Sequence, residues 1–209
     1  MKTSAVIFDL DGVLTDTAEF HYIAWKAIAN KLGIEFNQED NEKLKGVDRE
    51  NSLRYIIDKG GIKIDAEQFE QLLVKKNEHY LTLINDINPS HLFPGVLACF
   101  ATLKKANIKI GLASASKNAS LVINKLGIEP LFDFIGDAAS VAHSKPAPDI
   151  FLAVAEGLKV APQNCIGVED AVAGITAIKS ANMFAVGIGD AQVLTQAELI
   201  FPNMNEFDF

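Results

Sequence analysis

The chain has 209 residues, of which 49% are hydrophobic, and its formal net charge is −8 at pH 7. This length suits one large or two small domains, and the acidic balance argues against nucleic acid or an anionic membrane as the main partner. No apolar run reaches the length of a membrane-spanning helix. The first four residues lead straight into a short apolar segment, so we expect no signal peptide and a cytoplasmic location. In that reducing setting Cys99 and Cys165 are expected to be free thiols.

The stretch from Ser4 to Gly12 is the first motif of the chain. Residues 5–8 are all apolar and predict a buried β-strand. Asp9 and Asp11 follow, and residues two apart on an extended chain point the same way. Two like charges at the end of an apolar strand are costly unless a cation or a proton offsets them. The motif therefore indicates either a metal site with a nucleophilic carboxylate or an ordinary strand-to-turn junction.

Helices alone are expected over residues 15–87. Apolar residues recur at helical spacing over residues 18–32, with Asp16 and Thr17 as candidate N-caps. Asp65 is a candidate cap for a later helix. The further helices are expected over residues 38–44, 49–59 and 66–84. We interpret residues 15–87 as a helical cap domain inserted after the first strand.

Strands alternate with helices in the rest of the chain. Strands are expected over residues 108–113, 132–135, 165–168, 183–188 and 199–201. Helices are expected over residues 94–106, 118–126, 147–157 and 172–181. This alternation predicts an α/β fold, a doubly wound parallel sheet with helices on both faces. We expect residues 1–14 and 88–209 to form this core domain.

Polar residues follow several of the predicted strands. Ser114 follows the second strand, Lys145 lies in the loop after the third, and Glu169 and Asp170 follow the fourth. Ligands bind outside the carboxyl ends of such strands, so these side chains and Asp9 are expected to meet at one edge. Each has a simpler explanation: Ser114 as a helix cap, Lys145 as a solvated lysine, and the acidic pair as helix N-terminal charges.

The set as a whole resembles the haloacid dehalogenase superfamily of phosphotransferases. The matching residues are Asp9-Leu10-Asp11-Gly12, Ser114, Lys145 and Glu169-Asp170, in the family's order and after the corresponding strands. The resemblance covers the whole chain and includes the inserted helical cap. Ala171 departs from the family pattern, in which a serine is frequent at this position.

The resemblance implies a role for each of these residues. Asp9 would be the nucleophile that forms an aspartyl-phosphate, and Asp11 the general acid/base. Lys145 would pair with the nucleophile and the phosphate, and Ser114 would donate to a phosphoryl oxygen. Mg²⁺ is the implied cofactor. Its ligands would be Asp9, the backbone carbonyl of Asp11, Asp170 and Glu169.

Further residues resemble the sugar-phosphate mutases of this superfamily. They are Thr17, His21, Gly46, Arg49, Ser52, Lys76, Ser116, Lys117 and Asn118. The resemblance implies that they bind the substrate, with Arg49 on the distal phosphate and His21 near Asp11. Arg49 could instead be an ordinary helix N-terminal residue, His21 a core histidine, and Lys76 part of a solvated helix face.

The implied activity is a Mg²⁺-dependent interconversion of β-D-glucose 1-phosphate and glucose 6-phosphate through a sugar bisphosphate. The implied partner is a phosphorylated sugar, and we expect a monomer. A small-molecule phosphatase on the same scaffold is the alternative, because water can also attack an aspartyl-phosphate. A non-catalytic phospho-acceptor or dinucleotide-binding module is disfavoured, since neither G-x-G-x-x-G nor G-x-x-x-x-G-K-[ST] follows a predicted strand.

Overall fold

The computed structural model describes residues 2–207. Its centre is a parallel sheet of six strands in the order β3-β2-β1-β4-β5-β6. The strands are β1 (Ala5–Phe8), β2 (Lys109–Leu112), β3 (Phe134–Ile135), β4 (Cys165–Glu169), β5 (Phe184–Ile188) and β6 (Leu199–Phe201). The predicted doubly wound parallel sheet is confirmed, with the N-terminal strand at its centre.

Strand β1 is buried on both faces, which explains its unbroken apolar sequence. Val6 and Phe8 belong to one hydrophobic cluster, and Ala5 and Ile7 belong to the other. All four side chains are fully buried. Because β1 pairs with β2 on one side and β4 on the other, the residue that follows it lies between the ends of both neighbours.

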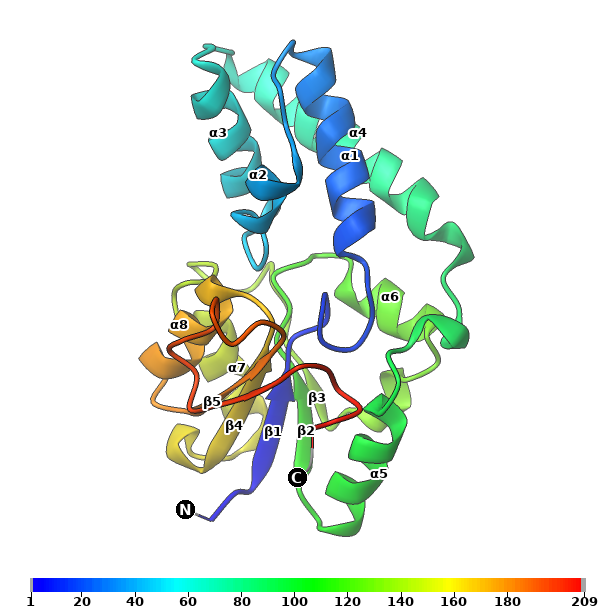
Figure 1. Ribbon diagram of the computed structural model, residues 1–209, viewed down its shortest axis with the longest axis vertical. Helices are drawn as coiled ribbons and strands as arrows, with labels where there is room; N and C mark the ends of the chain where they lie inside the picture. The colour runs from blue at the N-terminus through cyan, green and yellow to red at the C-terminus, as the bar shows by residue number, and fades with distance from the viewer. Residues whose placement is uncertain (1, 208–209) are drawn as a thin grey trace.

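Two helices cover each face of the sheet (Figure 1). Helices α5 (Val96–Lys105) and α6 (Ala119–Lys125) pack on the face that carries Val6, and α7 (Asp149–Leu158) and α8 (Val172–Ser180) pack on the opposite face. Short 3₁₀ helices lie at Ile84–Asp86, Pro89–His91, Glu129–Leu131 and Pro162–Asn164. Within residues 2–207, no helix is long and apolar enough to cross a membrane.

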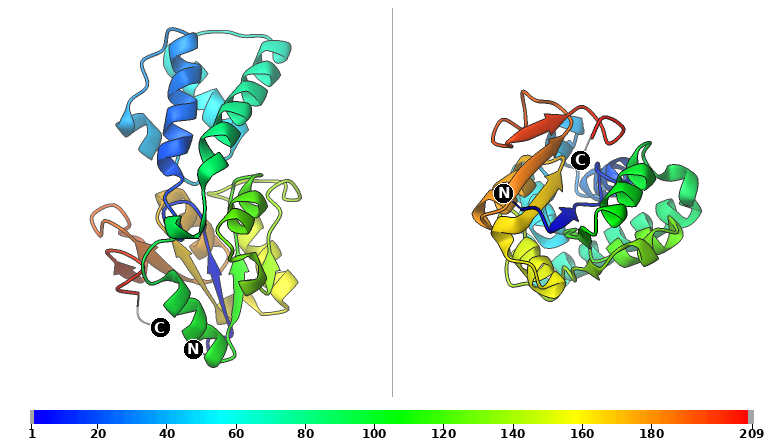
Figure 2. Two further views of the ribbon diagram at one scale, coloured as in Figure 1. Left: turned by 90° about the vertical axis from the view of Figure 1, so that its right-hand side faces the viewer. Right: turned by 90° about the horizontal axis from the view of Figure 1, so that it is seen from below.

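The other four helices stand beyond the carboxyl ends of the strands (Figures 1 and 2). They are α1 (Ala18–Lys31), α2 (Gln38–Glu42), α3 (Arg49–Gly60) and α4 (Ala66–Leu83). They enclose a hydrophobic cluster of their own, which includes Trp25, Leu53 and Leu72. The structure describes all of residues 15–87 and has no strand there. The proposed domain boundaries, 15–87 against 1–14 and 88–209, remain a prediction.

The helix caps match the expectation at some positions and not at others. Asp65 accepts a hydrogen bond from the Gln68 amide, as expected for the cap of α4. Asp48 caps α3 in the same way, through the amides of Glu50 and Asn51. The expectation of a side-chain cap at the start of α1 is wrong. Thr17 takes the N-cap position, but its backbone is helical (φ −102°, ψ −3°) and its side chain accepts no capping bond.

Candidate active site

The carboxyl edge of the sheet brings together the residues that the sequence placed there. Asp9 follows β1, Ser114 lies just beyond β2, and Glu169 is the last residue of β4. Lys145 enters from the loop between β3 and α7. All four side chains are buried. The strand ends and the loops that follow them thus bring two carboxylates, a hydroxyl and an ammonium to one place.

Lys145 links two of these strands through ion pairs. Its Nζ donates to Asp9 Oδ1 at 2.5 Å and to Glu169 Oε1 at 2.6 Å, and its side chain has no exposed surface. Burial alone lowers the pKa of an ammonium, but Asp9 and Glu169 outweigh it and raise the pKa of Lys145. The interpretation of Lys145 as a solvated loop lysine is therefore wrong.

Three carboxylates gather next to Lys145. Oxygens of Asp9, Glu169 and Asp170 all lie within 4.8 Å of one another. Burial raises the pKa of Asp9 to about 8, although Lys145 opposes the shift. Burial, together with Glu169 and Asp9, also raises the pKa of Asp170 well above its ordinary value. One ammonium cannot balance three carboxylates, two of them buried and one partly buried, whereas one further divalent cation would, so the cluster is suited to a metal ion.

The members of this cluster differ in how free their oxygens are. Both oxygens of Glu169 accept hydrogen bonds, because Oε1 accepts from Lys145 and Oε2 accepts from the Ala171 amide at 2.8 Å. Within residues 2–207, the one side-chain interaction of Asp170 is a distant ion pair, with Lys45 Nζ 3.9 Å from Oδ2. Asp170 also approaches the chain after Asp11 closely, since a Cβ on Gly12 (φ +84°) would lie 2.1 Å from its Oδ2. A glycine after Asp11 is thus required for this approach.

Asp11 lies at the cavity without a direct partner for one of its oxygens. Its Oδ1 is buried and makes no hydrogen bond among residues 2–207. Burial raises the pKa of Asp11 to about 6, against the opposing charges of Lys145 and Lys76. A carboxyl group with this pKa can hold or release a proton near neutral pH, which is what a general acid/base requires.

Lys76 and His21 contact each other in the cap. Lys76 Nζ lies 2.8 Å from His21 Nδ1 and lies over the rings of Trp25 and Tyr80 at 4.9 and 4.7 Å. Lys76 is 2% exposed, so its alternative interpretation as a solvated surface lysine is wrong. Burial, with help from Arg49, lowers its pKa to about 7. Burial and Lys76 lower the pKa of His21 well below its ordinary value, so the imidazole is neutral and Nδ1 can accept from the ammonium.

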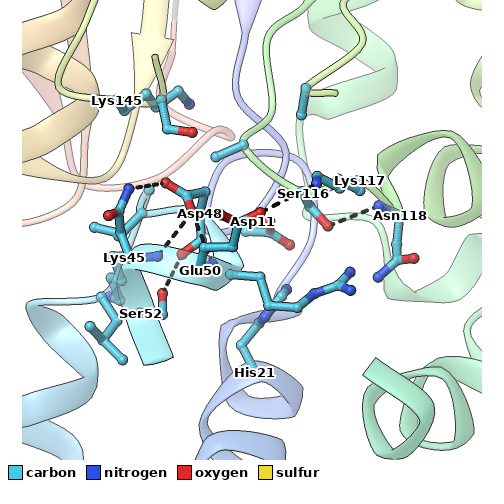
Figure 3. Close-up of a pocket in the computed structure, with 18 of the residues that line it drawn as sticks. Asp11, His21, Lys45, Asp48, Glu50, Ser52, Ser116, Lys117, Asn118 and Lys145 are labelled. Atoms are coloured by element: carbon cyan, nitrogen blue, oxygen red, sulfur yellow. Dashed lines mark hydrogen bonds and ion pairs between the residues drawn. The ribbon is translucent and has the colours of Figure 1, made fainter. Parts of the chain in front are cut away.

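The loop after β2 forms a chain of hydrogen bonds. The Ser116 amide donates to Ser114 Oγ at 3.1 Å, and the Asn118 amide donates to Ser116 Oγ at 3.2 Å. Ser114 therefore accepts from its own loop and does not cap α6, because Asn118 takes the N-cap position. Lys117 has 53% of its side chain exposed, and its Nζ lies 3.9 Å from Glu50 Oε1 of the cap. Figure 3 shows the side chains of this loop and of the cap around one cavity.

The cap residues predicted to bind substrate take different positions. Arg49 begins α3 and lines the cavity. Gly46 (φ +73°) brings its loop over the core, where a Cβ would lie 3.5 Å from that of Ala171 and 3.8 Å from Lys145 Cδ. Ser52 lines the cavity but its hydroxyl donates to the Asp48 carbonyl at 2.8 Å. Thr17 is fully buried and does not line the cavity.

The cavity between cap and sheet has a volume of about 560 Å³. Its wall includes the carboxylates of Asp9 and Asp11, and it has cations from both the core and the cap. The predicted residues on it are Asp9, Asp11, His21, Gly46, Arg49, Ser52, Lys76, Ser116, Lys117, Asn118 and Lys145. A cavity of this size holds a small phosphorylated molecule, and its cations suit an anion with more than one charge.

Three polar residues without a role predicted from the sequence join the cap to the core. Lys45 approaches Asp170, Glu50 approaches Lys117, and Asn77 accepts a hydrogen bond from Asn118. Each of the three stands beside a residue predicted to bind substrate, namely Gly46, Arg49 and Lys76. Their contacts could not be predicted, because contacts between residues far apart in sequence leave no local pattern.

Comparison with known proteins agrees with this geometry. The haloacid dehalogenase-like hydrolase family model matches residues 3–182. Beta-phosphoglucomutase of Bacillus subtilis is 48% identical over 198 residues, which cover 94% of this chain and 88% of that protein. The crystal structure of beta-phosphoglucomutase from Clostridium difficile has a TM-score of 0.97 and 48% identity, covering 99% of this chain and 94% of that chain.

A more distant relative carries a different name. The phosphorylated carbohydrates phosphatase of Thermotoga maritima is 28% identical over 200 residues, which cover 92% of this chain and 90% of that protein. The fold and the order of the site residues agree with the family match over nearly the whole chain. The chain therefore belongs to the haloacid dehalogenase-like hydrolase family, in the branch that contains the beta-phosphoglucomutases.

Proposed function

We propose that this chain interconverts β-D-glucose 1-phosphate and glucose 6-phosphate through a phosphorylated Asp9 and glucose 1,6-bisphosphate. The names of the Bacillus subtilis and Clostridium difficile relatives support this activity. The observation that carries it is the shared cavity, in which Asp9 and Lys145 of the core face Arg49 and Lys76 of the cap. A bisphosphate needs cations at both of its ends, and this cavity has them.

Mg²⁺ is the cation that we propose for the acidic cluster. Asp9, Asp170 and the backbone carbonyl of Asp11 would hold it, with Glu169 contributing while it anchors Lys145. These are hard oxygen donors, the kind that Mg²⁺ prefers. When bound, Mg²⁺ neutralises charge on the transferring phosphoryl group.

The side chains of the site divide the reaction between them. The Asp9 carboxylate attacks phosphorus, and the bond between phosphorus and the sugar oxygen breaks. Asp11 in its protonated form gives that oxygen a proton. In the other half of the cycle, the free 6-hydroxyl of β-D-glucose 1-phosphate attacks the phosphoryl group on Asp9, the bond between phosphorus and Asp9 breaks, and Asp11 takes up the hydroxyl proton. The bisphosphate formed in this way turns round, and Asp9 then takes the phosphoryl group from its other end and releases glucose 6-phosphate. Lys145 and Ser114 hold the phosphoryl oxygens throughout.

The remaining predicted residues bind the part of the substrate that does not react. Arg49, Ser116, Lys117 and Asn118 would hold the distal phosphate, for which a planar guanidinium is well suited. Lys76 and His21 would place the sugar beside Asp11, and Gly46, Ser52 and Thr17 would shape the cap around it. One chain supplies all of these groups, which supports a monomer as the active unit.

An anomer-resolved coupled assay tests the proposal. The chain is given β-D-glucose 1-phosphate, Mg²⁺ and a catalytic amount of glucose 1,6-bisphosphate, and glucose 6-phosphate is followed with its dehydrogenase. We expect NADH or NADPH to form while little free phosphate appears. The name of the Thermotoga maritima relative favours a phosphatase as the second candidate. Release of phosphate without glucose 6-phosphate would establish that candidate instead.

A further inference from the structure

One hydrogen bond joins a side chain of the cap to a side chain of the loop between β2 and α6, residues 113–118, which is named the phosphate loop after its proposed role. Asn118 Nδ2 donates to Asn77 Oδ1 at 2.9 Å across 41 positions of the chain. Asn77 belongs to α4, and Asn118 stands at the start of α6. Among residues 2–207, no other hydrogen bond links side chains of residues 15–87 and 88–207; the two ion pairs between them are both 3.9 Å long.

The Asn118 side chain is free to make this bond because it does not serve its own helix. Asparagine at an N-cap ordinarily accepts a hydrogen bond from an amide of the first helical turn. Asn118 occupies the N-cap position of α6 without such a bond (φ −99°, ψ 5°). Its amide group points toward the cap, where Asn77 accepts a hydrogen bond from one of its two N–H groups. Within the described part of the chain the second N–H makes no hydrogen bond, so it can donate to a phosphate oxygen.

Asn77 also stands next to the buried Lys76 of the cap. It directly follows Lys76, and neighbouring helical residues are about 100° apart around the axis. Lys76 therefore turns inward to His21 while Asn77 turns toward the core loop. The same helical turn sets the position of the Lys76 ammonium and touches the loop of Ser116 and Asn118. A shift of α4 would therefore move the Lys76 ammonium and break the contact with Asn118 together.

We propose that Asn77 is a positioning residue, which orients the Asn118 amide toward the distal phosphate and fixes α4 against the phosphate loop. The inference rests on the proposed function for the identity of the ligand. Asn77 itself does not line the cavity, so its effect must pass through Asn118. A contact that merely adds stability would leave phosphate binding unchanged.

A double-mutant cycle on ligand affinity separates these roles. The affinity for glucose 6-phosphate is measured by calorimetry for the wild type, Asn77→Ala, Asn118→Ala and the double variant, all with Mg²⁺. We expect each single variant to bind about tenfold more weakly, the effect of one hydrogen bond to a charged group. We expect Asn77→Ala to add nothing in the Asn118→Ala background. Glu78→Ala, an exposed neighbour on α4, should bind as the wild type does.

Several outcomes would overturn the inference. They are unchanged affinity in Asn77→Ala, losses that multiply in the double variant, or an equal loss in Glu78→Ala. The coupled assay is run on the same wild-type protein. If the wild type makes no glucose 6-phosphate in that assay while the double-mutant cycle behaves as expected, the mutase proposal fails and the role of Asn77 stands. A wild type that does not bind glucose 6-phosphate would overturn both.

Discussion

Lys145 Nζ lies 2.5 Å from Asp9 Oδ1, and the ammonium and the carboxylate are both buried. The same nitrogen reaches Glu169 at 2.6 Å. One lysine thus fixes the positions of the residue after β1 and the last residue of β4, and it is the nearest positive charge to the proposed nucleophile. Because water is excluded here, the pair is far more sensitive to the loss of one partner than a surface ion pair would be.

Lys145→Met should destabilise the chain and abolish phosphoryl transfer. The substitution leaves Asp9 and Glu169 buried without their counter-charge, which typically costs about 3–5 kcal/mol. Urea unfolding at pH 7 measures the loss. Lys179→Met is the matched control, since Lys179 pairs with Glu198 at a site where both side chains are 35–40% exposed, and it should cost less than about 1 kcal/mol. Equal losses in the two variants would contradict the central role of Lys145.

Asp9→Asn should remove turnover while preserving the fold. The amide keeps the shape of the carboxylate but cannot form an acyl phosphate, so activity should fall by about a thousandfold or more. Mass spectrometry after incubation with a small phosphoryl donor should find no phosphorylated protein, whereas the wild type gains one phosphoryl group. A circular dichroism spectrum identical to that of the wild type completes the test. Phosphorylation retained in the variant would remove Asp9 as the nucleophile.

Mg²⁺ should stabilise the folded chain, because it balances buried carboxylates that the unfolded chain exposes to water. At about 100 times its dissociation constant, the gain should be about 2.7 kcal/mol. Thermal unfolding with MgCl₂ and with EDTA measures it. Asp170→Asn should lose most of the gain, and Asp58→Asn, an exposed carboxylate on α3, should keep it. A gain that survives in Asp170→Asn would place the ion elsewhere.

The sequence predicted the core of this site well for a physical reason. Strand β1 is buried on both faces, so its apolar run has only one plausible structure, and parallel strands bring their carboxyl ends to one edge. Asp9, Ser114, Lys145 and Glu169 could therefore be placed without knowing any tertiary contact.

The cap could be predicted only in part, because its chemistry depends on packing between helices. Lys75 and Lys76 are adjacent on an amphipathic helix, and local pattern does not tell which is buried. Packing of α4 against α1 decides it, through His21 and Trp25. The missing cap bond at Thr17 likewise follows from a helical backbone that residue preferences do not reveal.

Arg49→Ala should separate the two halves of the reaction. Arg49 lines the cavity from the start of α3, so its loss should spare phosphorylation of Asp9 by a small donor such as acetyl phosphate. Use of glucose 1,6-bisphosphate should fall by about a hundredfold, because a bidentate charged contact is lost. Stopped-time assays with each donor measure both steps. Arg54→Ala, whose side chain lies over Phe69 within the cap, is the control. Equal impairment of both donors would assign Arg49 a structural role.

Lys76 should make the stability of the chain depend on pH in a predictable direction. Its pKa is about 7 in the folded chain and 10.5 when exposed. Between these values the unfolded chain binds the proton and the folded chain does not, so the contribution of Lys76 to the unfolding free energy rises with pH. The slope is at most about 1.4 kcal/mol per pH unit.

The measurement compares each variant with the wild type, because the raised pKa of Asp9, about 8, acts in the opposite direction in the wild type. Urea unfolding at pH 7, 7.5, 8 and 8.5 should show the difference between wild type and Lys76→Met growing in favour of the wild type as the pH rises. Lys75→Met, at the exposed neighbouring position, should track the wild type across the whole range. A pH-independent difference for Lys76→Met would mean that the folded chain keeps this lysine protonated, with Asp11 and His21 compensating for its burial.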